Sequence, residues 1–403
     1  MLITKGASAC GVLLVAVLLL LACGSEDSSS GPSSPAPSVN STWQTFRGGA
    51  ASDIAEAVIA TPDGGCIVGG LTSSFNAAGW DIYLVRFDGD GRLVWEQVYG
   101  TAGDDAVFAI TAATDGGGYV MAGRQGSDVY LFKIDDGGSV LWQKTYGGSG
   151  VEEGRAVAPM ADGGYIVVGW TDSYGAGGQD IYLLKVDHTG ELVWQNTLGG
   201  SGGEQARDVI ELEDGFLVVG WTTSFGSGAQ DVYLARTDDV GELVRESSFG
   251  GSGSDEARAL APTSDGGCII VGWTESIGAG QVDMYLILVD SSGSSVRQKV
   301  FGGVSDDYGW SLTAVPGGHI LAGWTHSWGS GDDDVFLVKV DQNQTALWQR
   351  SYGSLGRDRC YAMAPAVDGG LFLAGVTTSF TAAGTDLYVL KTDASGNTGE
   401  LVD

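Results

Sequence analysis

The sequence repeats one pattern of apolar runs and glycines seven times, and this repetition restricts the fold more than any other feature. Each copy has an apolar run, such as Tyr-Ile-Val-Val at 165–168, that ends at a glycine, and these glycines follow one another at 46 to 53 residues. The equivalent positions are Gly70, Gly123, Gly169, Gly220, Gly272, Gly323 and Gly375. A period near fifty residues indicates a solenoid or a propeller.

Four short strands per copy decide between these two architectures. In the third copy the apolar or alternating runs are Arg155–Met160, Tyr165–Thr171, Asp180–Val186 and Leu192–Leu198. Asp and Gly between these runs favour tight hairpins. None of the runs keeps a helical period over more than two turns, and a stacked β-solenoid normally has a much shorter period. The sequence therefore predicts an all-β fold, a seven-bladed β-propeller of four-stranded antiparallel blades.

The ends of the array predict how the ring closes. Residues 42–48 match the outermost strand and exit loop of a blade, whereas the last copy supplies only three clear strands. We therefore expect the N-terminal strand to complete blade seven and remove an open sheet edge. Gly399-Glu400-Leu401-Val402 echoes the start of an outermost strand, and either competes for that place or extends it. The expected propeller spans 42–403, with blades at about 49–99, 100–146, 147–198, 199–249, 250–301, 302–352 and 353–403 plus 42–48.

The N-terminus has the pattern of a targeting segment. Lys5 precedes an apolar run, Val12 to Ala22, that is too short to span a bilayer as a helix. The run ends Leu-Leu-Ala-Cys, which resembles the bacterial lipobox, and that resemblance implies a signal peptide over 1–22 and a lipid on Cys23. Residues 23–41 are rich in Ser, Pro and Gly, so we expect a disordered tether. The alternative is an ordinary cleaved signal peptide with a chance cysteine.

Gly24 follows the lipidated cysteine, where an Asp would be the familiar inner-membrane retention signal. We therefore expect a lipoprotein of the cell envelope in the outer membrane, facing either the periplasm or the surface. The mature chain would also carry Cys66, Cys268 and Cys360. These form neither a disulfide framework nor a zinc pattern, and we expect them to be buried apolar side chains.

The charge of the chain argues against one class of partner. The 50 acidic residues outnumber the 20 basic residues and give a net charge of −30. Such a charge repels phosphate backbones, so nucleic-acid binding is not expected. We expect a monomer that contacts the membrane through its lipid, with a glycan or an envelope protein as partner.

The segment 187–194, Asp-His-Thr-Gly-Glu-Leu-Val-Trp, resembles the tryptophan-docking repeat of quinoprotein-type propellers. In that family the Trp packs between blades. Arg245 and Arg297 replace this Trp in blades four and five, and Gln344 replaces the turn glycine in blade six. The full repeat over 42–403 is similar to a large group of uncharacterised secreted or lipid-anchored propeller proteins of bacteria and archaea. The resemblance implies the architecture and no particular activity.

Two comparisons within that wider superfamily bear on function. Quinone-dependent enzymes use adjacent cysteines, and this chain has no Cys-Cys pair, so we do not expect a quinone cofactor. The propeller lipoprotein of the outer-membrane assembly machinery is a non-catalytic scaffold, but it has eight blades and this sequence has seven.

The long loops before the first and third strand of each blade should emerge on one face, here called the long-loop face, opposite the tight hairpins. Acids recur before the first strand, where they would form a cation rim able to hold Ca²⁺, or a solvated acidic rim. These candidate residues are Asp53, Asp104, Asp105, Glu152, Glu153, Glu204, Asp255, Glu256, Asp306, Asp307 and Asp358.

Aromatic residues recur in the other long loop, at Phe75, Tyr174, Phe225, Trp328 and Phe380. They are candidate stacking surfaces for sugar rings, or staples that hold the loop. Trp170, Trp221, Trp273 and Trp324 follow the repeat glycine within a strand, so we expect them in the core. The Asp that begins each third strand recurs seven times and is expected to be structural.

The sequence does not provide a clear catalytic set. The three histidines lie in different repeat positions, and the one Gly-x-Ser-x-Gly match, at 199–203, lacks the strand–turn–helix context of a nucleophile elbow. We therefore expect a non-enzymatic, lipid-anchored propeller that presents a binding or scaffold surface on its long-loop face. The alternatives are a polysaccharide-active enzyme of the glycoside hydrolase type that uses rim carboxylates, and an outer-membrane assembly scaffold.

Overall fold

The computed structural model describes residues 41–75, 79–263, 265–381 and 384–402, and the predicted signal peptide, Cys23 and most of the tether lie outside them. The described residues form strands and no helix, and therefore include no helix long and apolar enough to cross a membrane.

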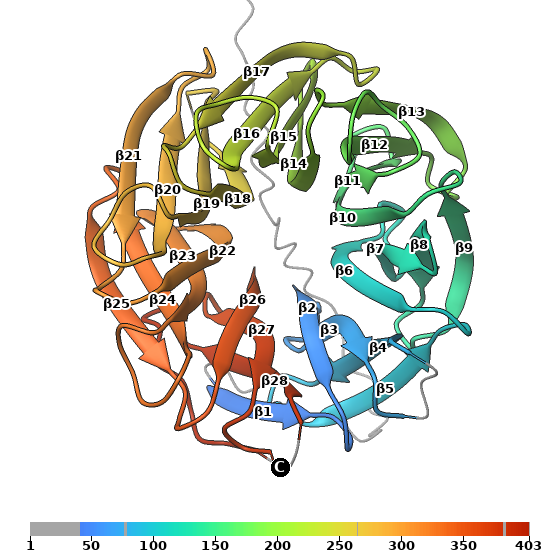
Figure 1. The fold of residues 1–403 in the computed structure, drawn as a ribbon. Helices are drawn as coiled ribbons and strands as arrows, with labels where there is room; N and C mark the ends of the chain where they lie inside the picture. The colour runs from blue at the N-terminus through green and yellow to red at the C-terminus, as the bar shows by residue number, and fades with distance from the viewer. Residues whose placement is uncertain (1–40, 76–78, 264, 382–383, 403) are drawn as a thin grey trace, which may run out of the picture. The chain divides into compact units, whose positions relative to one another are not determined.

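The strands form seven four-stranded antiparallel sheets around a central channel, which confirms the predicted seven-bladed β-propeller (Figure 1). The strands nearest the channel are β2 (Asp53–Ala60), β6 (Asp105–Ala112), β10 (Glu152–Pro159), β14 (Glu204–Leu212), β18 (Asp255–Pro262), β22 (Asp307–Val315) and β26 (Asp358–Pro365). The second strands are β3 (Cys66–Thr72), β7 (Tyr119–Gln125), β11 (Tyr165–Thr171), β15 (Gly215–Thr222), β19 (Cys268–Thr274), β23 (Gly318–Thr325) and β27 (Leu371–Thr377). The third strands are β4 (Asp81–Phe87), β8 (Asp128–Ile134), β12 (Asp180–Val186), β16 (Asp231–Thr237), β20 (Asp283–Val289), β24 (Asp334–Asp341) and β28 (Asp386–Thr392). The outer strands are β5 (Leu93–Tyr99), β9 (Val140–Tyr146), β13 (Leu192–Leu198), β17 (Leu243–Phe249), β21 (Ser295–Phe301), β25 (Ala346–Tyr352) and β1 (Trp43–Arg47).

The predicted strands of the third repeat agree with the structure except at the channel. The second, third and outer strands have the predicted bounds, but β10 begins at Glu152 and not at Arg155. The reason is that Glu152 and Glu153 are buried strand residues, although their charge had suggested a loop.

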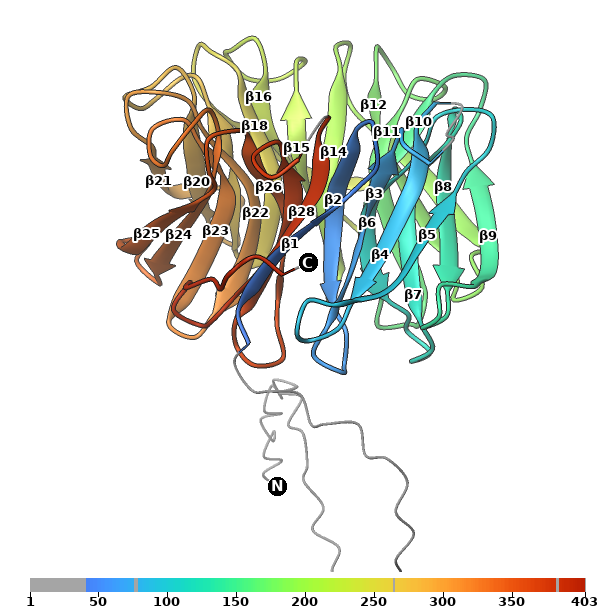
Figure 2. The same ribbon diagram turned by 90° about the horizontal axis from the view of Figure 1, so that it is seen from below.

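The N-terminal strand closes the ring, as expected. β1 pairs with β28 and completes the sheet β1-β28-β27-β26 of blade seven (Figure 2). The C-terminal segment extends this sheet and does not compete for the place of β1, because Val402 N donates to the Gln44 carbonyl at 2.8 Å. Cys66, Cys268 and Cys360 are buried free thiols, and burial raises the pKa of Cys268 and of Cys360 to about 12.

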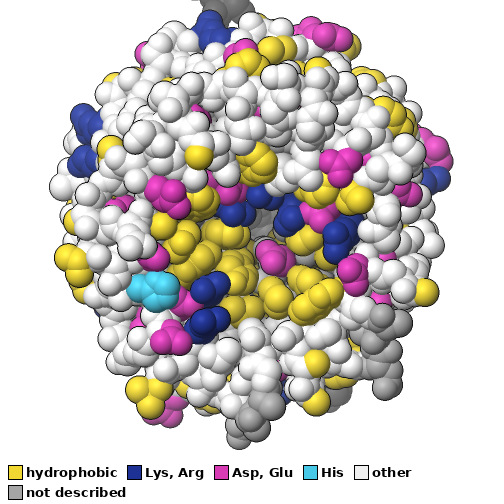
Figure 3. Space-filling view, in the orientation of Figure 1, with side chains coloured by type: hydrophobic (Ala, Val, Ile, Leu, Met, Phe, Trp, Pro, Cys, Tyr) yellow, Lys and Arg dark blue, Asp and Glu magenta, His cyan; other side chains and the backbone are white. Residues whose placement is uncertain are grey.

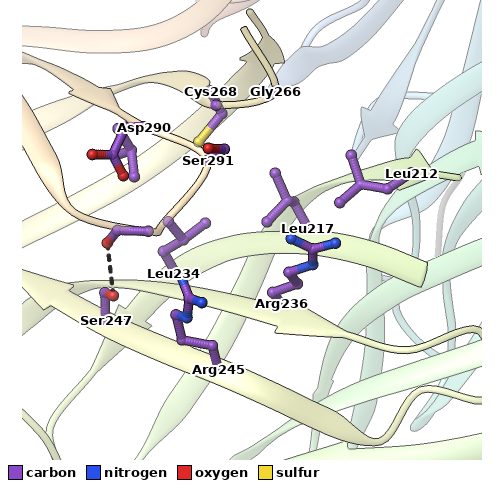
Figure 4. Close-up of a pocket in the computed structure, with 13 residues that line it drawn as sticks. Leu212, Leu217, Leu234, Arg236, Arg245, Ser247, Gly266, Cys268, Asp290 and Ser291 are labelled. Atoms are coloured by element: carbon purple, nitrogen blue, oxygen red, sulfur yellow. Dashed lines mark hydrogen bonds between the residues drawn. The ribbon is translucent and has the colours of Figure 1, made fainter. Parts of the chain in front are cut away.

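Tryptophan docking joins neighbouring blades at the hairpin face. A Cβ placed on Gly190, in the turn of blade three, would lie 2.8 Å from the ring of Trp142 in blade two. A Cβ placed on Gly241, in the turn of blade four, would lie 2.7 Å from the ring of Trp194 in blade three. Trp43 makes the same contact with Gly91 and so joins blade seven to blade one. Where Arg245 replaces the Trp, a small cavity of about 30 Å³ remains between blades four and five (Figure 4).

Hydrogen bonds join the same neighbours at the long-loop face. The backbone N–H at the first residue of each channel strand donates to the preceding blade, for example from Glu152 to the Ser127 carbonyl at 2.7 Å. The equivalent bonds start from Asp53, Asp105, Glu204, Asp255, Asp307 and Asp358. Blades are thus fixed at both faces, and the channel between them has a rigid wall.

Candidate functional site

Every channel strand contains a β-bulge at the same place. In β10, Gly154 pairs with Gly169 and Ala156 pairs with Val168, so Arg155 has no partner in the register. The same break occurs in the other six channel strands. A bulge redirects the side chain of the extra residue, and here the redirected side chains line the central channel. We call these seven residues the bulge ring: Glu56, Phe108, Arg155, Arg207, Arg258, Trp310 and Tyr361.

The repeat glycines explain how the bulge is accommodated. A Cβ placed on Gly169 would lie 1.7 Å from the carbonyl oxygen of Glu153, and one on Gly272 would lie 1.8 Å from that of Glu256. Only a residue without a side chain allows the bulged strand to approach its neighbour so closely. The glycines that mark the repeat in the sequence therefore have a direct role in shaping the channel.

The bulge ring differs in chemistry around the channel although its position is repeated. Blades three, four and five contribute Arg155, Arg207 and Arg258 in succession, blades six and seven contribute Trp310 and Tyr361, and Phe108 and Glu56 complete the ring. All seven are half-buried. They line a cavity of about 100 Å³. The channel therefore has a cationic side and an aromatic side.

A second cavity of about 420 Å³ shares Glu56, Arg258, Trp310 and Tyr361 with the first. Its other lining residues are Trp273, Tyr308, Trp324, His326 and Arg359. Figure 3 shows the hollow along the channel axis, surrounded by hydrophobic side chains and by several Lys or Arg side chains. We call the two cavities together the channel mouth. Its volume falls within the roughly 300–1,000 Å³ of small-molecule sites.

Buried carboxylates hold the arginines in place. Arg207 Nε donates to Glu256 at 2.7 Å, and Arg258 Nε lies 3.0 Å from the same carboxylate. Arg155 and Arg124 both form ion pairs with Glu153, and the distance from Arg124 Nη1 to Glu153 Oε1 is 2.9 Å. Asp333, fully buried, accepts from Arg359 at 2.6 Å and also contacts His326. Such pairing fixes the orientation of the guanidinium groups and lowers the cost of placing them in the channel.

The pKa shifts in the bulge ring follow from burial. Burial raises the pKa of Glu56, while Arg155, Arg258 and Arg207 oppose this shift. Burial lowers the pKa of Arg258 to about 9, against the stabilising effect of Glu256. Shifted pKa values in groups that share a cavity make these residues candidates for a functional site.

The aromatic side of the channel mouth combines one stacked pair, Tyr308 and Trp324, with several inclined rings. Trp324 lies 4.7 Å from Tyr308 and 4.9 Å from Trp310, and Trp310 lies 5.4 Å from Tyr361, all between ring centroids. The Arg258 guanidinium carbon lies 3.5 Å from the Trp310 centroid, a cation–π contact that joins the two sides.

The four tryptophans expected in the core differ in how deeply they are buried. Trp170 and Trp324 are buried, but Trp221 and Trp273 are half-buried, and both Trp273 and Trp324 line the channel mouth. The expectation of a simple core role is corrected here, because their strand borders the channel strand as well as the neighbouring blade.

The acids of the predicted cation rim lie in two environments. The first acid of each channel strand is fully buried and accepts hydrogen bonds from the long loops. Glu204, for example, accepts from Gly200 N at 2.7 Å and from Thr222 Oγ1 at 2.8 Å. The residues of this kind are Asp53, Asp105, Glu152, Glu204, Asp255, Asp307 and Asp358.

The other four predicted acids are Asp104, Glu153, Glu256 and Asp306. Glu153 and Glu256 hold the channel arginines, whereas Asp104 and Asp306 accept from the backbone of Trp80 and Val282. Over the described ranges, no three Asp, Glu, His or Cys side chains are grouped so that they would hold a metal ion. The predicted Ca²⁺ rim stays a prediction.

A second carboxylate lies beside each buried first acid. The Asp that begins a third strand approaches the first acid of the next blade, and the two flank the glycine that ends the outer strand: a Cβ on Gly353 would lie 2.2 Å from Asp334 Oδ1 and 2.7 Å from Asp358 Oδ2. Burial raises the pKa of Asp334 to about 6, and Asp358 adds to the shift. Asp386 has the same raised pKa, about 6, beside Asp53.

Each predicted loop aromatic packs on the aromatic ring of the third strand in its own blade. Phe75 lies 5.2 Å from Tyr83, and Trp328 lies 5.2 Å from Phe336, between centroids. Tyr174, Phe225 and Phe380 make the equivalent contacts. Phe75, Tyr174 and Trp328 still expose 38 to 41% of their surface. They are loop staples with one free side, and a role in binding stays a prediction.

Sequence reasoning missed the bulge ring. Its signal was a position that varies from Glu to Phe, Arg, Trp and Tyr inside otherwise regular repeats.

No protein-family model matches this sequence, and no curated protein is significantly similar to it. Solved structures are similar in fold. Sqt1 from Chaetomium thermophilum has a TM-score of 0.50 at 12% identity, over 89% of this chain and 99% of that one. BamB from Moraxella catarrhalis has a TM-score of 0.40 at 13% identity, over 86% and 85%. An acylaminoacyl peptidase from Pyrococcus horikoshii has a TM-score of 0.48 at 13% identity, over 88% of this chain and 52% of the peptidase. The similarity to Sqt1 concerns the fold alone.

Proposed function

We propose that this protein is an extracytoplasmic binding protein whose channel mouth takes an anionic ligand. The observation that carries the proposal is the bulge ring. Seven equivalent positions on a rigid scaffold carry unlike side chains, with three consecutive arginines facing an aromatic wall. The packing that the blades share does not set the identity of these residues, and a rigid scaffold that positions variable residues is a common arrangement for binding.

The lipid anchor predicted at Cys23 is part of this proposal. Ser41, where the described chain begins, donates through Oγ to the Gly89 carbonyl at 2.7 Å, in a hairpin turn of blade one. The tether would therefore join the hairpin face, and the channel mouth would open on the opposite, long-loop face. Metabolic labelling with palmitate tests the anchor, which requires label in the wild type and none in Cys23→Ala.

An array of neutral and acidic glycans, nucleotides and acidic peptides tests the binding site. We expect the full-length chain in detergent to bind acidic members, Arg258→Met to lose this binding, and Trp328→Ala to retain it. The opposite pattern, loss in Trp328→Ala and retention in Arg258→Met, would move the site to the loop aromatics. Binding that neither variant changes would contradict both placements.

A polysaccharide-active enzyme is the second candidate, because the raised pKa of Glu56 suits a general acid. The nearby Glu153 and Glu256 are tied to arginines, so Glu56 is the carboxyl group left for chemistry. Release of reducing ends from acidic polysaccharides by the wild type, abolished in Glu56→Gln, would support this candidate. An assembly scaffold would instead co-purify with outer-membrane proteins after crosslinking.

A further inference from the structure

We propose that the ligand of the channel mouth is a uronic acid residue of an acidic glycan, bound with its carboxylate among the bulge-ring arginines and its sugar ring against the aromatic wall. This inference rests on the proposed function and names the ligand class for that site.

The charge of the channel mouth suits one carboxylate. The four arginines that line the cavities, Arg155, Arg207, Arg258 and Arg359, are balanced by the four carboxylates of Glu56, Glu153, Glu256 and Asp333. Protonation of Glu56 leaves one positive charge without a partner. A nucleoside di- or triphosphate brings more negative charge than this surplus neutralises, and the net charge of −30 on the chain opposes it further.

Arg207 has the geometry to receive a carboxylate. It donates to Glu256 through Nε, and in the part of the chain that the structure describes no acceptor bonds its two terminal nitrogens. A guanidinium fixed through Nε presents its terminal N–H groups as a fork that fits a planar carboxylate.

The two cavities differ in size, and together they suit a ligand that has a small polar group and a larger ring. The cavity lined by the bulge ring is about 100 Å³, the smaller of the two. A carboxylate group fits there. The adjoining cavity of about 420 Å³ has the space for one or two sugar rings.

The inclination of the aromatic rings favours a puckered sugar over a flat base. Trp310 and Trp324 are inclined at 45°, and Trp324 and Tyr361 at 88°. A flat base stacks best between parallel faces, whereas these rings form a basin whose sides contact a non-planar ring on several C–H groups. The hollow is open along the channel axis, so the remainder of a glycan chain can extend outward (Figure 3).

Isothermal titration calorimetry of the full-length chain in detergent tests the proposal. The probes are oligomers of galacturonate, mannuronate and guluronate, a hyaluronan tetrasaccharide, their carboxyl-reduced forms, UDP and benzoate. We expect at least one uronate oligomer to bind with a Kd below 1 mM, and its carboxyl-reduced form to bind at least tenfold more weakly.

Two variants separate the parts of the site. Arg207→Gln should weaken uronate binding at least tenfold. Trp273→Leu should weaken the binding of the uronate oligomer more than it weakens the binding of benzoate. The matched control is Arg92→Gln, at an exposed hairpin residue whose side chain is 70% exposed. Unchanged thermal melting of each variant shows that it is folded.

The outcomes distinguish this inference from the proposed function. Binding of UDP or benzoate that depends on Arg207, with no uronate binding, would overturn the uronate assignment and leave the anion site in place. Absence of Arg207-dependent binding for every probe would overturn both.

Discussion

Glu56 places a single carboxyl group in a cavity that it shares with three guanidinium groups. The charged and titratable groups that act on it are Arg155, Arg207, Arg258 and Glu153, and Tyr361 lines the same cavity. An anionic ligand in this cavity would be repelled by ionised Glu56 and not by its protonated form.

Anion binding should therefore strengthen as the pH falls through the raised pKa of Glu56. As the pH falls from 8 we expect the Kd of a uronate oligomer to fall several-fold, while Arg258, with a pKa of about 9, stays largely protonated. Glu56→Gln should bind about tenfold more tightly than the wild type at pH 8, a difference of about 1.4 kcal/mol, and should lose the pH dependence. Calorimetry at four pH values measures both effects. A Glu56→Gln profile parallel to that of the wild type would contradict this role.

Gln344 has a left-handed backbone conformation that favours glycine. Its φ is 57°, it occupies the turn position that glycine holds in other blades, and its buried Oε1 has no hydrogen-bond partner among the described residues. Gln344→Gly should stabilise the protein by about 1 kcal/mol, since relief of the left-handed strain and of the unpaired oxygen exceeds the entropy cost of glycine. Urea unfolding measures the change. The reverse substitution in another blade, Gly241→Gln, should destabilise.

At the scale of elements, the bulge depends on the glycine of the neighbouring strand. Gly272→Ala in β19 would place a methyl group 1.8 Å from the Glu256 carbonyl, so the bulge in β18 must shift. We expect a loss of about 2–3 kcal/mol, typical of overpacking, together with loss of anion binding because Arg258 is displaced. Gly117→Ala is the control, since its nearest neighbour would be 3.7 Å away. Unfolding and titration on both variants test the prediction, and retained binding in Gly272→Ala would refute it.

The carboxylate pairs between blades make stability depend on pH in a definite direction. Asp334 has a folded pKa of about 6 against an ordinary value of 3.8, so its folded form holds its proton more tightly. Its contribution is fully present below pH 3.8 and is lost as the pH rises through about 6. Asp358, Asp333 and the Ser330 N–H face this group.

Asp334→Asn should therefore raise the melting temperature at pH 8 and have little effect at pH 4. The exposed Glu213→Gln should have a small effect at both pH values. Calorimetric melting across this range gives the test. A bound divalent cation at the pair would give the opposite result, a lower melting temperature for Asp334→Asn at pH 8.

The same elements show what the sequence can predict. Hydrophobic alternation and turn residues located the second, third and outer strands of the third repeat, because these lie in uniform surroundings. The start of β10 was three residues off because buried charges are accepted where a loop supplies N–H donors to Glu152. Arg155 could not be placed, since a bulge changes which face a side chain occupies and leaves no mark in the alternation of apolar residues.

At the scale of the whole molecule, closure depends on a strand that is distant in sequence from its partners. Trp43 in β1 is only 2% exposed and lies 6.0 Å from both Phe87 of blade one and Phe372 of blade seven, between centroids. Its Nε1 donates to the Gly89 carbonyl at 3.0 Å. One side chain thus joins the last blade to the first at the hairpin face, in addition to the hydrogen bond from Asp53 N to the Thr385 carbonyl at the long-loop face.

Trp43→Ala should destabilise the ring by about 3–5 kcal/mol, as expected for removal of a large buried side chain. Trp194→Ala is the matched control: it removes the equivalent docking residue between blades three and four, but Trp194 is only half-buried and the chain is continuous there. We expect a smaller loss and unchanged anion binding for Trp194→Ala. Trp43→Ala should also weaken anion binding, because Glu56 and Tyr361 come from the two blades that this strand joins. Urea unfolding measures the loss of stability in each variant, and titration with the anionic ligand measures the loss of binding. Equal losses in the two variants would mean that the ring is held by each blade contact alike, and that closure by β1 has no special role.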